Sequence, residues 1–202
     1  PAVRKLRELI RAGKFGDITS IITRRVGLAP PRIHDADVVT DLAVHDIDIA
    51  NFLIGKQPVD VYANSGNGNL KDRVDFSEIF LNYGSCNAII SVNWLTPLKI
   101  RKMSVTGTQG YAELDFIRQE LLLFEAPPSN SFDGFADFIV KYGHDDARRL
   151  PVDFAEPLAA ELEHFIHCVE RRAQPEVGCS EAIAVLSVVK KVIQQNSEKR
   201  RR

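Results

Sequence analysis

The sequence predicts an α+β fold, in which helices pack on one face of an open, mainly antiparallel six-stranded sheet. Two observations lead to this prediction. From about residue 59 the apolar residues recur with a period of two, and short turns separate the runs. Two segments with helical periodicity then close the chain. With 202 residues, 45% of them hydrophobic, we expect one domain over residues 1–202.

Four segments precede the predicted sheet. The spacing of apolar residues in 2–12 predicts a short amphipathic helix. Residues 18–26 are rich in β-branched side chains and predict a strand. Residues 27–37 contain two prolines and no periodic pattern, which is typical of a loop. A second helix is expected from about Thr40 to Ile54, because Gly55 follows as a stop signal.

The sheet itself is predicted from six runs separated by Gly, Asn or Pro. They are residues 59–66, 75–83, 86–95, 100–107, 111–116 and 120–125. Apolar and polar residues alternate along 87–94, which predicts one packed face and one more polar face. The pattern between 126 and 150 is weak, and 127–134 reads as a surface loop. The closing helices are expected at 156–172, with one apolar stripe, and at 180–195.

Composition excludes several classes of function. The net charge is -1, so no basic surface for nucleic acid is expected. No apolar run approaches the roughly 18 residues of a membrane span, and no signal peptide is visible. The three cysteines are too scattered for a disulfide framework or a zinc site, which favours a cytoplasmic protein. Because the chain begins with Pro1 and its one methionine is Met103, we expect a processed product or a fragment.

Motifs for nucleotide phosphates are missing from the sequence. No G-x-G-x-x-G follows a strand and opens a helix, and there is no P-loop. The glycines of GNGN at 66–69 lie between two predicted strands and read as a turn. Neither a dinucleotide nor a triphosphate can therefore be held in this chain by either of these two motifs.

The helix predicted at 40–54 combines apolar residues with charges. At about 100° per residue, one stripe contains Asp41, His45, Asp48 and Phe52, and the opposite side carries Ala43, Ile47, Ala50 and Ile54. Asp46 projects elsewhere and is expected at the surface. Apolar neighbours flank the charged stripe, which favours a cleft, where a carboxylate can stabilise a charged imidazole.

Three interpretations of this stripe remain open. Asp41 and His45 can form an acid–base pair, in which the carboxylate fixes the histidine tautomer while the imidazole takes a proton from an alcohol as hydride leaves the carbon. They can instead be an exposed pair that stabilises the helix by a few tenths of a kcal/mol. A metal site ranks third, because no fourth ligand has a fixed spacing, and no metal is expected.

Four segments together resemble the glucose-fructose oxidoreductase and inositol dehydrogenase family, Gfo/Idh/MocA. They are TDLAVHDIDIANFLIG at 40–55, PAVRKLRELIRAGKFGDI at 1–18, SVTGTQGYAELD at 104–115 and PLAAELEHFIHCVERRAQPEV at 157–177. The resemblance implies the C-terminal substrate and oligomerisation domain, with a dihydrodipicolinate reductase-like fold. It also implies that the family's N-terminal Rossmann domain, which holds NAD or NADP and supplies a lysine, is absent from this chain.

The resemblance also assigns roles to residues. Asp41 and His45 match the catalytic aspartate and histidine of the family, and Asp48 would have a structural or substrate-binding role. Arg24, Arg25 and Arg32 resemble members that act on nucleotide sugars, where arginines could hold a diphosphate; the alternative is that they are ordinary surface residues. His34 could line the same cleft. Residues 35–37 read Asp-Ala-Asp where many members carry glycines, so the substrate itself does not follow from the resemblance.

The function expected from the resemblance is oxidoreduction. This chain would be the substrate-binding and catalytic half of an NAD(P)-dependent enzyme that interconverts a hydroxyl and a ketone on a sugar, nucleotide sugar or cyclitol, and would be inactive alone. The alternative is a non-catalytic sugar-binding or oligomerisation module. Because an open sheet leaves one face uncovered, we expect a homodimer or homotetramer that forms through that face.

Overall fold

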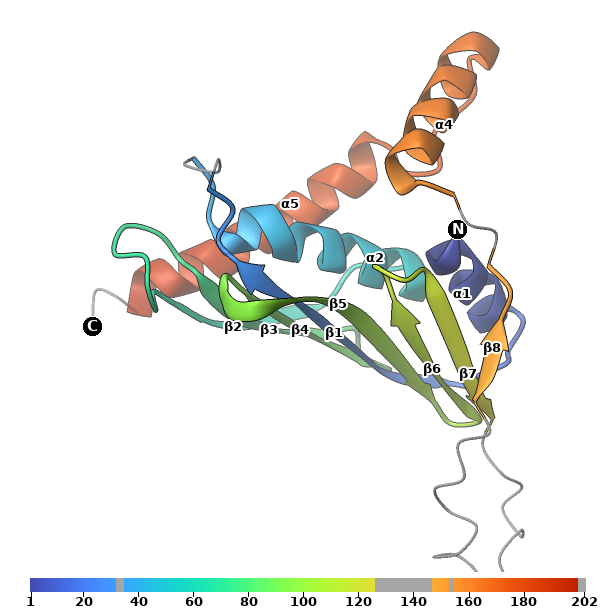
Figure 1. Cartoon of the computed structure of the whole chain (residues 1–202), viewed down its shortest axis with the longest axis horizontal. Helices are drawn as coiled ribbons and strands as arrows, with labels where there is room; N and C mark the ends of the chain where they lie inside the picture. The colour runs from blue at the N-terminus through green and yellow to red at the C-terminus, as the bar shows by residue number, and fades with distance from the viewer. Residues whose placement is uncertain (32–34, 126–146, 153–154, 200–202) are drawn as a thin grey trace, which may run out of the picture.

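The computed structural model of the chain describes residues 1–31, 35–125, 147–152 and 155–199. It has an open sheet with helices α1, α2 and α5 over one face (Figure 1). The helical segments are α1 (Ala2–Arg11), the π-helical η1 (Val39–Ala43), α2 (Val44–Ile54), α4 (Pro157–Arg171) and α5 (Cys179–Lys199). The strands are β1 (Ile18–Leu28), β2 (Asp60–Gly66), β3 (Phe76–Asn82), β4 (Asn87–Asn93), β5 (Leu95–Gly107), β6 (Gly110–Asp115), β7 (Glu120–Glu125) and β8 (Arg148–Leu150). The predicted α+β class is confirmed.

Within the described residues the sheet has eight strands in the order β2-β3-β4-β1-β5-β6-β7-β8, where six were predicted. One added strand is β1, which was recognised as a strand but not placed in the sheet. It lies in the centre, parallel to β4 and antiparallel to β5. The other is β8, whose three residues are too few to produce a period-two pattern. The remaining pairs in the described ranges are antiparallel.

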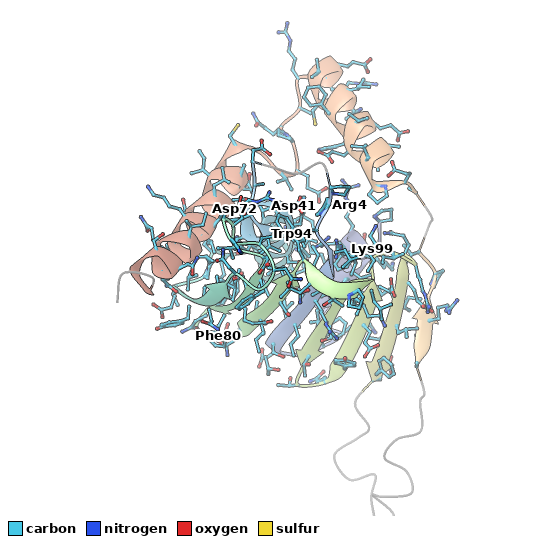
Figure 2. All side chains as sticks on the ribbon, turned by 60° about the vertical axis from the view of Figure 1, so that its left-hand side comes forward. Arg4, Asp41, Asp72, Phe80, Trp94 and Lys99 are labelled. Carbon is cyan, nitrogen blue, oxygen red and sulfur yellow. The ribbon has the colours of Figure 1, made fainter. Side chains whose placement is uncertain are left out.

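One face of the sheet forms the core with the helices. Ile21, Ile79, Ile90 and Val105 project toward the helices and are almost fully buried. Ile47 and Ala50 of α2 and Val188 and Val192 of α5 close the core from above. Figure 2 shows Asp41 on this helical side and Phe80 on the opposite face of the sheet. Burial of apolar area on this one face holds the two layers together.

Helix α4 differs from the other helices. It stands away from the sheet (Figure 1), and none of its residues is buried within the described part of the chain. The predicted apolar stripe is present but exposed, at Leu158, Leu162, Phe165, Ile166 and Val169. Its sequence pattern therefore predicted the helix correctly, although the stripe has no packing partner in the described residues.

Ile47 tests how strongly α2 is held to the sheet. Its side chain is 0% exposed, so Ile47→Ala should lower the free energy of unfolding by about 2–5 kcal/mol. The matched control is Ile183→Ala on α5, because Ile183 is 64% exposed and should change stability by less than about 1 kcal/mol. Urea unfolding followed by circular dichroism measures both values. Equal losses for the two variants would contradict this packing of α2.

Candidate active site on helix α2

The helical segment that carries the candidate site begins with a wide turn. Val44 N–H donates to the carbonyl of Val39, which makes residues 39–43 π-helical. Asp37 precedes this turn, and its Oδ1 accepts from the N–H of Val39 at 3.1 Å and of Thr40 at 2.9 Å. Such π-helical turns within helices are frequent at functional sites. Asp41 lies in this turn and His45 in the α-helical turn that follows.

Helix α2 has Ile47 and Ala50 inside and His45 outside, as the helical plot predicted, whereas Leu53 takes the buried place expected for Ile54. Ile47, Ala50 and Leu53 are buried against the sheet, whereas His45 is exposed and Asp48 is half-buried on the outer side. Gly55 then ends the helix in the left-handed region at φ 79°, and its N–H donates to the carbonyl of Asn51 at 2.7 Å. The imidazole of His45 is thus accessible from outside the domain.

Asp46 corrects the sequence analysis, which expected it at the surface. The side chain is 1% exposed and faces the sheet. Its carboxylate accepts two hydrogen bonds from Arg25 of β1, from Nε to Oδ2 and from Nη2 to Oδ1, each at 2.8 Å. A helical plot shows only the direction in which Asp46 projects from the helix. It could not show that Arg25, which lies 21 residues earlier in β1, supplies the cation that makes burial of the Asp46 carboxylate tolerable.

A pocket of about 290 Å³ continues the outer side of α2 toward α1 and the start of α5. Its walls include Asp48, Asn51 and Phe52 of α2, Arg7 of α1 and Glu181 of α5. The guanidinium carbon of Arg7 lies 3.7 Å from the centre of the Phe52 ring. The sequence analysis missed Arg7 and Glu181, because they come from helices far apart in the sequence and neither belongs to a recognisable motif.

Charges around the pocket act on Asp48. Burial raises the pKa of the Asp48 carboxyl above its usual range, the neighbouring His45 opposes the rise, and Glu181 adds to it. The predicted stripe therefore brings Asp48 within electrostatic reach of His45. Asp48 is also the charged residue of α2 that lines the pocket.

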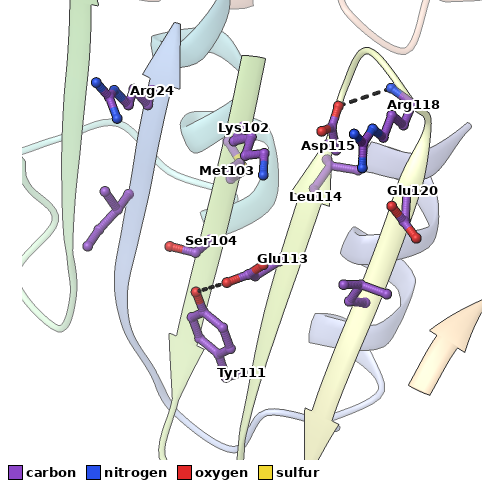
Figure 3. A pocket seen from close by; sticks show the side chains of 12 residues that line it. Arg24, Lys102, Met103, Ser104, Tyr111, Glu113, Leu114, Asp115, Arg118 and Glu120 are labelled. Atoms are coloured by element: carbon purple, nitrogen blue, oxygen red, sulfur yellow. Dashed lines mark hydrogen bonds between the residues drawn. The ribbon is translucent and has the colours of Figure 1, made fainter. Parts of the chain in front are cut away.

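The structure places the predicted arginines in different surroundings. Arg25 is engaged by Asp46, whereas Arg24, its neighbour in the strand, is exposed and points to the other face of the sheet. There it lines a hollow of about 330 Å³ together with Lys102, Tyr111 and Glu113 (Figure 3). Arg24 is therefore not brought together with His45. Arg32 and His34 lie outside the described residues.

Arg101 is a cation beside the site that the sequence analysis did not single out. Strand pairing places it directly opposite Arg25, and its Nη1 donates to the carbonyls of Val26 at 2.7 Å and Ile100 at 3.0 Å. Burial lowers the pKa of Arg101, the adjacent Arg25 lowers it further, and Asp46 and Asp41 counter both effects. Arg101 is thus in electrostatic contact with one member of the predicted catalytic pair. The sequence did not single out Arg101, because its position beside Arg25 depends on the pairing of β1 with β5.

The described residues contain neither a cluster of metal ligands nor a membrane-spanning helix. No group of three or more His, Cys, Asp or Glu side chains is arranged to hold a metal ion there. No helix in the described ranges has the length and hydropathy needed to span a membrane.

Comparison with known proteins identifies the family. Residues 3–113 match the model described as the GFO/IDH/MocA C-terminal domain. This chain belongs to the GFO/IDH/MocA family. The resemblance read from the four sequence segments is thereby confirmed.

Curated relatives of this GFO/IDH/MocA chain are dehydrogenases. It is 30% identical over 173 residues to UDP-N-acetylglucosamine 3-dehydrogenase of Acidithiobacillus ferrooxidans. The aligned residues make up 84% of this chain and 50% of that protein. It is 24% identical over 217 residues to inositol 2-dehydrogenase of Rhizobium meliloti, covering 99% of this chain and 61% of that protein. The chain thus spans about half to three fifths of the length of these relatives.

Solved structures share the fold. The UDP-N-acetylglucosamine 3-dehydrogenase of Acidithiobacillus ferrooxidans superimposes with a TM-score of 0.75 at 20% identity, over 95% of this chain and 58% of that one. An aldose-aldose oxidoreductase from Caulobacter crescentus superimposes with a TM-score of 0.78 at 16% identity. The superposition covers 98% of this chain and 58% of that one. At these identities the likeness establishes the fold alone.

The raised pKa of Asp48 predicts a pH-dependent effect on stability. A carboxyl with a raised folded-state pKa contributes stability that is fully present below its unfolded pKa and is lost as pH rises through the folded pKa. Asp48→Asn removes this loss, so the variant should melt higher than the parent chain near pH 7. At about pH 3, where the carboxyl is protonated in both states, the difference should vanish. Thermal melts at the two pH values test this, and a variant that melts lower near pH 7 would contradict it.

Proposed function

We propose that this chain is the substrate-binding and catalytic half of an NAD(P)-dependent oxidoreductase that acts on a hydroxyl or ketone of a sugar, nucleotide sugar or cyclitol. The observation that carries the proposal is the placement of His45, exposed on the outer side of a helix whose inner side is buried. Asp41 precedes His45 by one helical turn. The names of the relatives support the substrate class, since they include a nucleotide-sugar and an inositol dehydrogenase.

The chain's own residues account for the proton in this reaction. In the oxidising direction His45 takes the proton of the substrate hydroxyl while the same carbon gives up hydride, and in the reducing direction it returns the proton to the carbonyl oxygen. The proposed role of the Asp41 carboxylate is to fix the tautomer of the imidazole during this transfer. A nicotinamide cofactor, when bound, supplies the acceptor or donor of hydride.

The cofactor must come to His45 from outside this chain. The sequence contains no glycine-rich turn for a dinucleotide, and the exposed imidazole leaves room for a group presented by another domain. One solved structure with the same fold, an oxidoreductase from Agrobacterium radiobacter with a TM-score of 0.73, is described in complex with NAD+. We therefore assign NAD or NADP to the whole protein, held mainly by a domain beyond the residues of this chain.

We also propose that the open face of the sheet joins copies of this chain into a homodimer or homotetramer. A row of directly paired residues crosses this face, and its apolar half consists of Tyr62, Phe80, Ile89 and Ile22. These side chains are 37–59% exposed. The other half is polar, with Ser104 and Glu113, and Arg24 and Lys102 lie beside it. A second copy related by a twofold axis can cover the apolar half and match these charges.

Substitution of His45 tests the proposed reaction. In a protein that combines this chain with its dinucleotide-binding domain, His45→Ala should lower kcat by about 10²–10⁴-fold, because the proton acceptor is lost, while the Kd for the nicotinamide cofactor stays the same. The control is His167→Ala, since His167 is exposed on α4. Turnover of UDP-N-acetylglucosamine and of inositol, followed by nicotinamide absorbance, measures the effect. Unchanged turnover in His45→Ala would leave the non-catalytic module as the better interpretation.

Substitution on the open face tests self-association. Ile89→Lys places a charge in the centre of the apolar row, where it would be buried without a partner, and should convert an oligomer into a monomer. The control is Ile183→Lys, because Ile183 is exposed on α5, away from this face. Sedimentation velocity of the three proteins reports their mass. A parent protein that sediments as a monomer would contradict the proposal.

A further inference from the structure

The Arg25–Asp46 ion pair lies directly beneath the helix that carries His45. The side chains are 14% and 1% exposed, and two hydrogen bonds of 2.8 Å join them side by side. We infer that Arg25 and Asp46 are positioning residues, which fix the rotation and depth of α2 on the sheet and thereby the places of His45 and Asp41. This inference rests on the proposed function.

Apolar contacts alone do not fix a helix in this way. Ile47, Ala50 and Leu53 hold α2 to the sheet, but burial of apolar area is non-directional and tolerates small rotations and shifts. The guanidinium is a rigid planar fork, and its paired bonds to a carboxylate define both distance and angle. Replacing a buried ion pair by apolar side chains often leaves stability unchanged or improves it. The value of this pair therefore lies in its geometry.

Asp46 directly follows His45 in α2, so the geometry of the Arg25–Asp46 pair bears on the position of His45. Consecutive residues of an α-helix are about 100° apart, so His45 moves with any rotation of α2 that moves Asp46. The turn before His45 is π-helical, which is a poorly populated form that needs support from its surroundings. Asp37 holds the start of this turn through the N–H groups of Val39 and Thr40. Asp46 provides the second anchor, one residue after His45.

Two side chains besides Asp46 lie next to Arg25. Its guanidinium carbon lies 5.3 Å from the centre of the Phe116 ring. On the neighbouring strand Arg101 stands directly opposite and is tied to the carbonyl of Val26 at 2.7 Å. Two adjacent guanidinium groups repel each other, and the carboxylate of Asp46 compensates this repulsion. Removing the charge of Asp46 should therefore release Arg25 as well as α2.

The test separates positioning from packing in the protein that contains both domains. Arg25→Met/Asp46→Leu replaces the pair by apolar side chains and should melt close to the parent protein. Its kcat should nevertheless fall about a hundredfold, since a misplacement of about 1 Å is enough for such a loss, while KM and the cofactor Kd stay within about threefold. Arg25→Lys keeps the positive charge but loses the planar guanidinium that binds a carboxylate through two hydrogen bonds. Its kcat should therefore remain below that of the parent protein. The control is Arg11→Met, which removes an exposed arginine at the end of α1.

Each outcome decides the inference. A folded double variant with the kcat of the parent protein would overturn it, as would full kcat in Arg25→Lys. A rise in KM without a fall in kcat would make Arg25 a substrate ligand and overturn it too. If the double variant does not fold, Asp46→Asn decides, because it keeps the shape and loses only the charge; it should lower kcat at least tenfold, and full kcat would refute the inference.

His45→Ala keeps this test distinct from that of the proposed function. If His45→Ala retains turnover, the proposed function fails, whatever the positioning variants do. If His45→Ala abolishes turnover and the folded positioning variants keep it, only the present inference fails.

Discussion

The central position of β1 is the constraint on which the site depends. The strand is hydrogen-bonded to β4 on one side and to β5 on the other, so its backbone cannot shift without breaking two ladders. Side chains must then alternate between the faces. Arg25 is directed to the helices and Arg24 to the open face. One strand thus supplies the ion-pair partner of α2, which carries the candidate site, and a charge on the surface proposed for self-association.

Two charges between α2 and the sheet have partners. Asp46 accepts both hydrogen bonds of Arg25, and Arg101 is satisfied in part by the carbonyls of Val26 and Ile100. A carboxylate buried alone would cost several kcal/mol. With these partners the inner side of α2 tolerates a charge directly after His45. The outer side carries His45 and Asp48, and the charge on Asp48 is influenced by His45 and by Glu181 in the wall of the adjacent pocket.

Family membership and local geometry support each other. The GFO/IDH/MocA match covers residues 3–113, which include α1, β1 and α2 and therefore most of the candidate site. The exposed imidazole and the missing dinucleotide motif both agree with a site completed by another domain. Helix α4 lies on the same side of the sheet as the other helices (Figure 1), and nothing in the described residues covers its apolar stripe.

The sequence by itself determined the period-two runs between 59 and 125, the end of α2 at Gly55, and the separation of His45 from the buried side of that helix. These features follow from local spacing, because the period of apolar residues fixes which side chains share a face. Only the tertiary structure decided the place of β1 within the sheet, the burial of Asp46 and the approach of Arg101. Each of these depends on a pairing between segments far apart in the chain, and local periodicity contains no information on which partner a strand or a charge will meet.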